Sequence, residues 1–492
     1  MIAQAGRPSP CLLDGAAYKE SLRDGRAVWM AGARVPDVTR EPALGAGIDL
    51  LAETFDAQFD PALRDVTTYV DEATGERVSR AWQIPRTVED LRQRRKLIEY
   101  TSLKTVGTFG RPPDLAPLIG IGLLARKPQF EKSPPAFARN NPDFADNIDR
   151  FVEFGRRNNR IAAEVLADPQ NDRSGPSGAT AGLLRIVDQE PAGVRVSGAK
   201  SVGSLAAQAH EILFTNLLRP DFPPEACVWA ALPVATEGLK LVCREPVTRP
   251  GADPFDHPIA RRCEESDQFL IFDRVLIPNE RVFNVGDPDL LRLYGPVTVW
   301  AHWHILTRLW VKAEVFVGTA QLVVDAIGTG KLQHIRAHVA ELIQYAQALK
   351  AFVLAAENTA EMTEGGVLAP DVNLLTAGRL YSIREYPRMI HTLQELCGQG
   401  LAMRFRRVDF DNPEIGPYLD QLLPGHEISA RDKNQLMNFV WDLTTDSNAG
   451  RTEIFENVNA TPAPLLRERL WAEYPRGHLV GRARELAGLP PR

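Results

Sequence analysis

The sequence has 492 residues, 44% of them hydrophobic and 24% charged, which is the composition of an ordinary folded chain of about three domains. Its net charge of -6 and the lack of any long Lys or Arg run argue against a nucleic-acid partner. Residues 1–10 lack the pattern of a signal peptide, and no stretch of about eighteen apolar residues follows, so we expect a cytoplasmic protein that does not enter a membrane.

The N-terminal third favours helices decorated with short strand pairs. Residues 27–30 and 33–35 flank a tight Ala-Gly turn, and residues 66–70 and 77–84 flank an acidic turn that contains Gly75. Helical sequence begins at a capping pattern near Thr87 and runs with interruptions to about residue 165. We therefore predict an N-terminal helical domain with β-hairpin decoration over residues 1–165.

One of these interruptions is the motif GRPPD at residues 110–114. Its two prolines end the preceding helix and place Arg111 on a rigid loop. A fixed arginine of this kind can bind an anion, although a solvated loop arginine is the commoner case.

The run ADPQNDRSGPSG at residues 167–178 lies where helical spacing gives way to short runs rich in valine and isoleucine. The loop joins two domains, and such junctions are common places for ligand sites. Its side chains offer donors and acceptors suited to a polar planar ligand, notably Gln170, Asp172, Arg173 and Ser174. The alternative is a polar interdomain turn.

The middle of the chain has the pattern of a β domain, which we place at residues 166–285. Its strand-like runs are residues 183–187, 194–197, 211–215, 227–232, 239–244 and 269–277. No helical crossovers separate these runs, so a barrel or sandwich is favoured over a parallel sheet. The sequence contains neither a GxGxxG dinucleotide motif nor a P-loop.

From about residue 297 the spacing is that of long amphipathic helices. The apolar residues of 305–327 and of 335–356 recur every three or four positions, and the Gly-Thr-Gly turn at 328–330 makes the two helices antiparallel. A third helix, residues 372–401, contains Pro387, which should kink or restart it, and a fourth runs over residues 429–444. We predict a C-terminal four-helix bundle and tail over residues 286–492.

No metal site is expected. His334 and His338 are four residues apart on a helix but lack acidic or cysteine neighbours, and the five cysteines show no pairing pattern, so they are expected to be reduced thiols. His304, Arg308 and Lys312 form a polar line along the first bundle helix, which could face either solvent or a ligand between domains.

Several ordered motifs resemble one family. They are LRDGRAVW at 22–29, GRPPD at 110–114, DPQNDR at 168–173, GAK at 198–200, CREP at 243–246, FDHP at 255–258, FDRVLIP at 272–278 and ERVF at 280–283. The chain resembles the flavin-dependent 4-hydroxyphenylacetate 3-monooxygenase family, the oxygenase components of two-component systems, over about residues 15–475. The resemblance implies an acyl-CoA dehydrogenase-like fold, mainly α with a central β domain: helical domain, middle β-barrel and four-helix bundle.

The resemblance also implies a mechanism. A separate reductase supplies reduced flavin, which reacts with O2 to a C4a-hydroperoxide that oxygenates the substrate. The expected cofactor is FAD, with FMN also possible, and the expected assembly is a homotetramer. The positions implied to contact flavin are Gln170, Asn171, Asp172, Arg173, Gly203, Ser204, Gly450 and Arg451. Arg111 matches the active-site arginine of the family, which can steady a phenolate or the peroxide.

Two positions depart from the family pattern. Leu115 stands where the motif usually continues to a tyrosine, and Glu164 stands where the family has an active-site histidine. A carboxylate at that place either contacts the substrate or points to solvent or pairs with a nearby arginine. His304 is then the best remaining proton-handling candidate, in competition with Glu164.

The sequence therefore predicts a reduced-flavin-dependent monooxygenase that acts on an aromatic, heterocyclic or amine small molecule other than plain 4-hydroxyphenylacetate, as in specialised metabolism. Arg111, His304 and Glu164 are the predicted catalytic residues, and Arg111, Leu115 and Glu164 the predicted substrate contacts. The alternative is a non-oxygenase flavoprotein, a dehydratase or oxidase, on the same scaffold. An iron-sulfur cluster near the GRPPD loop is disfavoured because no cysteine occurs between Cys11 and Cys227.

Overall fold

The computed structural model describes residues 11–131, 136–140, 142–172, 174–176, 180–219, 221–459 and 461–490. Its N-terminal helices and strands are α1 (Gly15–Ser21), β1 (Val28–Met30), β2 (Ala33–Val35), α2 (Pro42–Asp56), α3 (Arg64–Thr67), β3 (Thr68–Val70), β4 (Arg77–Ser79), α4 (Val88–Lys104), α5 (Ala116–Ala125), α6 (Lys127–Phe130) and α7 (Phe144–Arg157). The predicted strand pairs are confirmed as the antiparallel pairs β1·β2 and β3·β4. Helix α4 begins at the predicted cap, where Thr87 and Asp90 form a capping box.

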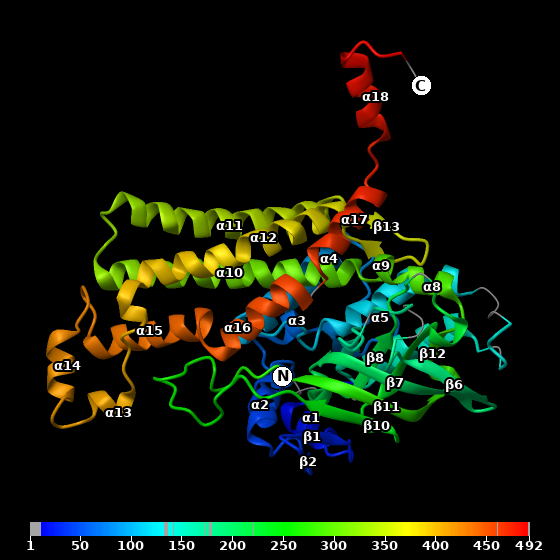
Figure 1. Cartoon of the computed structure of the whole chain (residues 1–492), viewed down its shortest axis with the longest axis horizontal. Coiled ribbons are helices and arrows are strands. Elements are labelled where there is room, and N and C mark those ends of the chain that lie inside the picture. The colour runs from blue at the N-terminus through cyan, green and yellow to red at the C-terminus, as the bar shows by residue number, and fades with distance from the viewer. Residues whose placement is uncertain are drawn as a thin grey trace, which may run out of the picture.

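The strands of the middle region form two sheets. They are β5 (Ala162–Val165), β6 (Arg185–Glu190), β7 (Gly193–Ser204), β8 (Glu211–Thr215), β9 (Val228–Pro233), β10 (Leu239–Cys243), β11 (Asp267–Pro278) and β12 (Val282–Val285). One sheet has the order β2-β1-β10-β11-β7-β6 and the other β12-β9-β8-β5. The pairing is antiparallel except for β1·β10 and β5·β8. The N-terminal hairpin thus extends the sheet of the middle region (Figure 1).

Strand β5 corrects one prediction. The helical spacing was expected to continue to about residue 165, but residues 162–165 form a buried strand in which Glu164 pairs in register with Leu213 of β8. The four residues Ala-Ala-Glu-Val are too short a run for their spacing to distinguish a helix from a strand, and pairing with a distant strand decides between them. This strand carries Glu164 into the interior.

The C-terminal region is helical. Its elements are α8 (Pro288–Arg292), α9 (Tyr294–Val297), α10 (Val299–Ile327), α11 (Gln333–Asn358), β13 (Glu361–Met362), β14 (Leu368–Ala369), α12 (Val372–Cys397), α13 (Arg407–Phe410), α14 (Gly416–Leu422), α15 (Ala430–Thr444), α16 (Ser447–Ile454), a π-helical turn (Phe455–Asn459), α17 (Ala463–Glu473) and α18 (Gly477–Leu486). Helices α10, α11 and α12 lie side by side, and α18 projects away from the body of the structure (Figure 1).

Helix α10 is the central helix because its first half is buried on every side. Residues 299–313 are all buried, including Trp300 and Trp303, whose indole N–H groups donate to Leu368 O and Glu357 Oε1 at 3.0 Å. Pro387 was expected to kink or restart the third helix, and α12 continues through it without a restart. Buried Tyr386 and Met389 on either side pack this segment into the bundle, which offsets the cost of about 3 kcal/mol for an internal proline.

Among the described helices, α11 alone has the length and composition to cross a membrane. It packs against α10 and α12, with Leu342, Leu349 and Val353 buried. A core helix of a bundle meets the same two criteria, and we interpret α11 as a bundle helix.

Candidate active site

The loop between α4 and α5 carries Arg111, and two contacts fix it. Asp114 is buried, with Oδ1 accepting from Thr101 Oγ1 at 3.2 Å and Oδ2 lying 3.0 Å from Nε2 of His304. At the other end of the loop the ring of Phe455 packs on Gly110, where an added Cβ would lie 2.2 Å from a ring carbon. Only glycine permits this close approach.

Arg111 points from this loop toward Glu164 on β5. Its Nε lies 3.6 Å from Oε2 of Glu164, and the hydroxyl of Tyr294 donates to Oε1 of the same carboxylate at 3.0 Å. The guanidinium carbon of Arg111 is 5.1 Å from the centre of the Phe455 ring. Its Nη1 is buried and has no hydrogen-bond partner among the described residues, so it is available to a bound oxygen atom or anion.

The protonation of this cluster follows from its burial. Burial raises the pKa of the Glu164 carboxyl, and the lowering effects of Arg111 and of the Tyr294 hydroxyl offset this only in part. Burial and then the neighbouring Glu164 charge raise the pKa of Tyr294 well above its usual value, so its hydroxyl stays a donor. The site thus combines a fixed cation with a carboxyl group that exchanges a proton closer to neutral pH than an exposed glutamate does.

Glu265 joins this loop to α16. Its Oε2 accepts from the backbone N–H of Gly110 at 2.7 Å and from Nη1 of Arg451 at 2.6 Å, and its Oε1 accepts from the backbone N–H of Arg111. Arg451 also binds Asp267, with 2.6 Å between Nη2 and Oδ1. These two carboxylates raise the pKa of Arg451 further above its usual range, and Arg451 in turn holds the pKa of Asp267 well below the usual value.

An open cleft of about 730 Å³ lies beside this cluster, between the strands β7, β10 and β11 and the helix α16. Both polar and apolar side chains line it. The lining residues are Ser201, Val202, Val242, Cys243, Arg244, Val247, Asp267, Gln268, Phe269, Ser447, Gly450, Arg451, Ile454 and Phe455. Phe455 and Arg451 therefore face both the cleft and the Arg111 loop. A cleft of this size can hold a planar ring system.

The polar line on α10 faces the interior rather than solvent. His304 contacts Asp114, Arg308 pairs with buried Glu456, and Lys312 lies 5.1 Å from the Tyr386 ring centre. Burial lowers the pKa of His304, although Asp114 raises it, and burial lowers that of Lys312 to about 7. The Nδ1 atom of His304 has no partner within the described chain.

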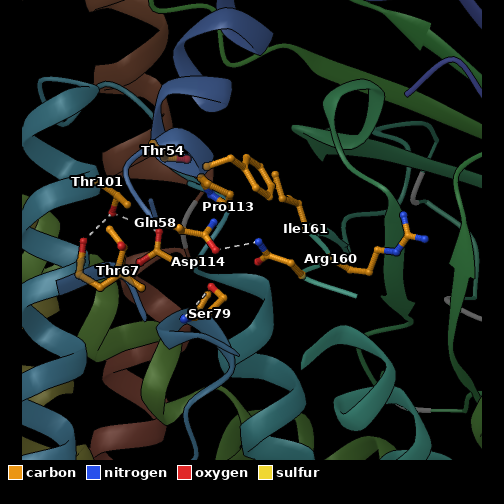
Figure 2. A pocket seen from close by; sticks show the side chains of 13 residues that line it. Thr54, Gln58, Thr67, Ser79, Thr101, Pro113, Asp114, Arg160 and Ile161 are labelled. Carbon is orange, nitrogen blue, oxygen red and sulfur yellow. Dashed lines mark hydrogen bonds between the residues drawn. The ribbon is translucent and has the colours of Figure 1, made fainter. Parts of the chain in front are cut away.

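Behind Asp114 lies a small pocket of about 40 Å³, large enough for one or two waters. Figure 2 shows the side chains that line it, among them Thr54, Gln58, Thr101 and Asp114. The pocket is separate from the larger cleft, since the two share no lining residue.

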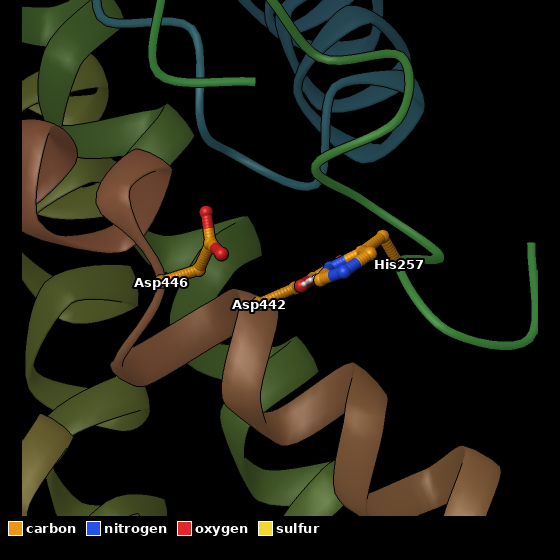
Figure 3. Close-up of side chains that lie close together, drawn as sticks. All are labelled: His257, Asp442 and Asp446. Carbon is orange, nitrogen blue, oxygen red and sulfur yellow. Dashed lines mark hydrogen bonds and ion pairs between the residues drawn. The ribbon is translucent and has the colours of Figure 1, made fainter. Parts of the chain in front are cut away.

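One group of His and Asp side chains in the described part of the chain is close enough to hold a metal, namely His257, Asp442 and Asp446 (Figure 3). Asp442 Oδ2 accepts from the backbone N–H groups of Ile259 and Ala260, both at 2.9 Å. Asp446 caps α16 and pairs with Arg249. These bonds already occupy the carboxylates, and they give the group a structural role that holds residues 249–260 against α15 and α16.

Comparison with known proteins identifies the family. The model described as 4-hydroxyphenylacetate 3-hydroxylase N terminal matches residues 14–284, and the model of the C terminal matches residues 294–488. The chain belongs to the 4-hydroxyphenylacetate 3-hydroxylase family.

Curated relatives within this family are monooxygenases. The chain is 33% identical over 456 residues to "4-nitrophenol 4-monooxygenase/4-nitrocatechol 2-monooxygenase, oxygenase component" of Rhodococcus opacus, covering 92% of this chain and 86% of that protein. It is 34% identical to "FADH(2)-dependent monooxygenase TftD" of Burkholderia cepacia, covering 91% and 87%.

Solved structures agree on the fold. The oxygenase component HpaB of 4-hydroxyphenylacetate 3-monooxygenase, complexed with FAD, superposes with a TM-score of 0.90 at 29% identity, covering 96% of this chain and 98% of that chain. An archaeal 4-hydroxybutyryl-CoA dehydratase has a TM-score of 0.86 at 20% identity, covering 98% and 96%. The second likeness concerns the fold alone.

The positions that the family resemblance implies to contact flavin lie in the cleft, on β7 beside it, and in the loop of residues 168–173; the implied substrate position Leu115 lies elsewhere. Gly450 and Arg451 line the cleft, whereas Gly203 and Ser204 follow its lining residues Ser201 and Val202 on β7. Gly203 and Ser204 are buried, and the Ser204 hydroxyl donates to Asp267. Leu115 is buried in the core where α5 begins.

The DPQNDR segment of this chain lies in an irregular loop as far as Asp172. Gln170 and Asp172 are exposed, and Asn171 is half-buried, with its Oδ1 lacking a partner in the described structure. Asn171 Nδ2 donates to Ala181 O, and Asp172 accepts from Ser174 N at 2.9 Å. Arg173 lies outside the described residues.

Four residues of the site were not predicted from the sequence: Tyr294, Phe455, Glu265 and His302. His302 is buried near Arg111, its Nδ1 lacks a partner among the described residues, and burial lowers its pKa well below the usual value. The acidic pair at 264–265, just before the strand-like run of residues 269–277, was the one available signal for Glu265. Tyr294 and Phe455 have no distinguishing spacing.

Proposed function

We propose that this chain is the oxygenase component of a two-component monooxygenase, which takes reduced FAD from a separate reductase and uses O2 to oxygenate an aromatic substrate. The observation that carries the proposal is the Arg111–Glu164–Tyr294 cluster beside an open cleft in a chain of the 4-hydroxyphenylacetate 3-hydroxylase family. The names of the relatives and the FAD complex of HpaB support the reaction class and the cofactor.

The residues of the cleft fit a flavin. Ser201 and Val202 on β7 and Gly450 and Arg451 on α16 would hold the ring system from two sides, and the unpaired Oδ1 of Asn171 would accept a bond from the same ligand. Reduced flavin supplies both electrons when one atom of O2 enters the substrate and the other leaves as water. Gly203, Ser204, Gln170, Asp172 and Arg173 are proposed to complete this site.

At the substrate end, Arg111 would steady a developing negative charge through its unpaired Nη1. Glu164, with its raised pKa, would exchange a proton with a bound O–H or N–H group, and the Tyr294 hydroxyl would keep the carboxyl oriented. His304 is fixed by Asp114 and is proposed as a second proton-handling group.

The substrate is proposed to differ from plain 4-hydroxyphenylacetate. Relatives of similar identity are named for 4-nitrophenol, 2,4,6-trichlorophenol and 4-hydroxyphenylacetate, so the substrate varies within the family. Leu115 gives an apolar wall where the family has a hydroxyl, and Glu164 places a carboxyl where the family has a histidine. An NH-bearing aromatic, heterocyclic or amine substrate, as in specialised metabolism, suits that carboxyl best.

We further propose that each chain divides into three domains, with boundaries at residues 165 and 285. We also propose that the protein is a cytoplasmic homotetramer. Helix α18 projects from the body with no buried residue, and its exposed Leu479, Val480 and Leu486 suit contact with another copy of the chain (Figure 1). Sedimentation of the full chain, against a chain that ends at Tyr474, tests this: the shortened chain should form a smaller species.

The reaction is tested with the purified chain, FAD, NADH, a flavin reductase and an aromatic, heterocyclic or amine candidate as substrate. Product should form only when reductase, FAD and O2 are all present, and the chain alone should not oxidise NADH rapidly. Rapid NADH oxidation by the chain alone, or failure of FAD to bind in a fluorescence titration, would overturn the proposal.

A further inference from the structure

The loop that carries Arg111 and the cleft-lining helix α16 share one buried carboxylate. Glu265 is 2% exposed and accepts two consecutive backbone N–H groups of the loop, from Gly110 at 2.7 Å and from Arg111. The same carboxylate binds the guanidinium of Arg451 at 2.6 Å. A buried charge is costly unless it is paired. The loop and the helix therefore cannot move apart without either exposing the Glu265 carboxylate to solvent or leaving it without a partner.

A second contact joins the same two segments. The Phe455 ring, which also lines the cleft, contacts two guanidinium groups, with its centre 5.1 Å from that of Arg111 and 5.0 Å from that of Arg451. Its ring packs directly on Gly110. The wall of the cleft and the loop of the substrate site are therefore in contact at both a charged and an aromatic group.

Asp267 provides an internal comparison. It binds Arg451 as Glu265 does, through Nε at 3.0 Å and Nη2 at 2.6 Å, but its remaining partners are Ser204 and Arg244, on the strand side of the cleft. No described residue of the Arg111 loop bonds to Asp267. Both carboxylates hold Arg451, and only Glu265 extends the contact to the loop.

We propose that Glu265 is a positioning residue that couples the occupation of the cleft by flavin to the position of Arg111. A flavin that packs against Arg451 and Phe455 restrains α16, and Glu265 transmits this restraint to the backbone of residues 110–111, so the substrate site is ordered once flavin is bound. This inference rests on the proposed function, because it takes the cleft as the flavin site. By reciprocity, substrate that orders the loop strengthens flavin binding by the same factor.

Hydrogen–deuterium exchange of the full-length protein tests the coupling without a known substrate. The probe is oxidised FAD at saturating concentration, with binding followed separately by fluorescence. In the wild-type protein, FAD should slow hydrogen exchange of a peptide that contains residues 110 and 111 by about fivefold or more. A fivefold effect is the lower end of the changes that coupling between two sites usually produces. The two N–H groups bonded to Glu265 are the reporters.

Glu265→Gln and Asp267→Asn form the matched pair. Each removes one carboxylate from Arg451 and should weaken FAD binding, but at saturating FAD the slowing at residues 110–111 should persist in Asp267→Asn and be lost in Glu265→Gln. Arg451→Met is the second variant. It leaves Glu265 on the loop and removes only the charged link to the cleft, while the Phe455 contact stays, so it should lose most of the slowing even if Glu265→Gln does not fold.

The outcomes separate this inference from the proposed function. If FAD does not bind the wild-type protein, the proposed function fails and the coupling fails with it. If FAD binds but the loop does not respond, or the response persists in Glu265→Gln or in Arg451→Met, the flavin site stands and the role of Glu265 is wrong. Loss of the response in Asp267→Asn to the same degree as in Glu265→Gln would also overturn it.

Discussion

The Nε atom of Arg111 lies 3.6 Å from Oε2 of Glu164, where the loop before α5 meets the buried strand β5. The two side chains are 15% and 3% exposed, so each provides the other's nearest opposite charge in a region of low dielectric. Removal of either partner leaves the other unbalanced. Variants at these two positions therefore change both the chemistry and the electrostatics of the site.

Arg111→Ala should lower product formation by about 10- to 100-fold, because a hydrogen bond to a charged group contributes about 1.5–3 kcal/mol. The fold should persist, since Arg111 lies on a loop. The measurement is product formed per reduced FAD consumed in a single turnover. Arg40→Ala, at a side chain that is 80% exposed, is the control. Unchanged turnover in Arg111→Ala would show that this arginine has no part in oxygen transfer.

Glu164→Gln should change the pH dependence of stability. The raised pKa of Glu164 means that the folded protein binds its proton more tightly than the unfolded chain does. This contribution is fully present below the ordinary pKa of a glutamate and is lost as pH rises through the folded value. The free energy of unfolding of the variant, relative to wild type, should therefore rise with pH.

Urea denaturation at several pH values between about 4 and 8 measures this difference. Glu89→Gln, on the exposed surface of α4, controls for the removal of one carboxylate. A difference between Glu164→Gln and wild type that falls as pH rises would mean that Arg111 and Tyr294 stabilise the ionised carboxylate more than burial destabilises it.

Local patterns in the sequence were sufficient for the capped start of α4, the break at Arg111 and the long bundle helices, because each depends on residues close together in the chain. Strand β5 could not be predicted, because its pairing with β8 decides its structure. The bonds from Gly110 and Arg111 to Glu265 join residues 155 and 154 positions apart. Such contacts depend on how the helical and β regions pack, which no local spacing encodes.

His304→Gln tests the second proton-handling group. The glutamine amide can still donate to Asp114, so the variant keeps this contact and removes the unpaired Nδ1. Because burial lowers the pKa of His304 from its ordinary 6.5, any limb of the pH–rate profile that depends on it should lie on the acid side of that value, and the variant should lack it.

The control for this variant is His338→Gln, at a partly exposed histidine of α11. A pH–rate profile that is the same in wild type and in His304→Gln would transfer the role to Glu164 or to solvent. The comparison needs kcat and kcat/KM separately, because a group that acts only in the complex with substrate changes kcat.

The last prediction concerns substrate choice. The wild-type protein should use 4-hydroxyphenylacetate poorly, since Leu115 offers no hydrogen bond to a buried phenol oxygen, a loss of about 1–3 kcal/mol, and an ionised Glu164 would repel a phenolate. The Tyr294 hydroxyl cannot donate to that oxygen, because its one proton is already donated to Glu164. The double variant Leu115→Tyr, Glu164→His should gain hydroxylation of 4-hydroxyphenylacetate, and each single variant should gain less. Product formation by all four proteins, at equal reduced FAD, measures this. Ortho-hydroxylation of 4-hydroxyphenylacetate by wild type at a rate similar to that of amine or heterocyclic candidates would show that Leu115 and Glu164 do not set the choice, because the phenol would then be accepted without a hydroxyl or an imidazole at these two positions.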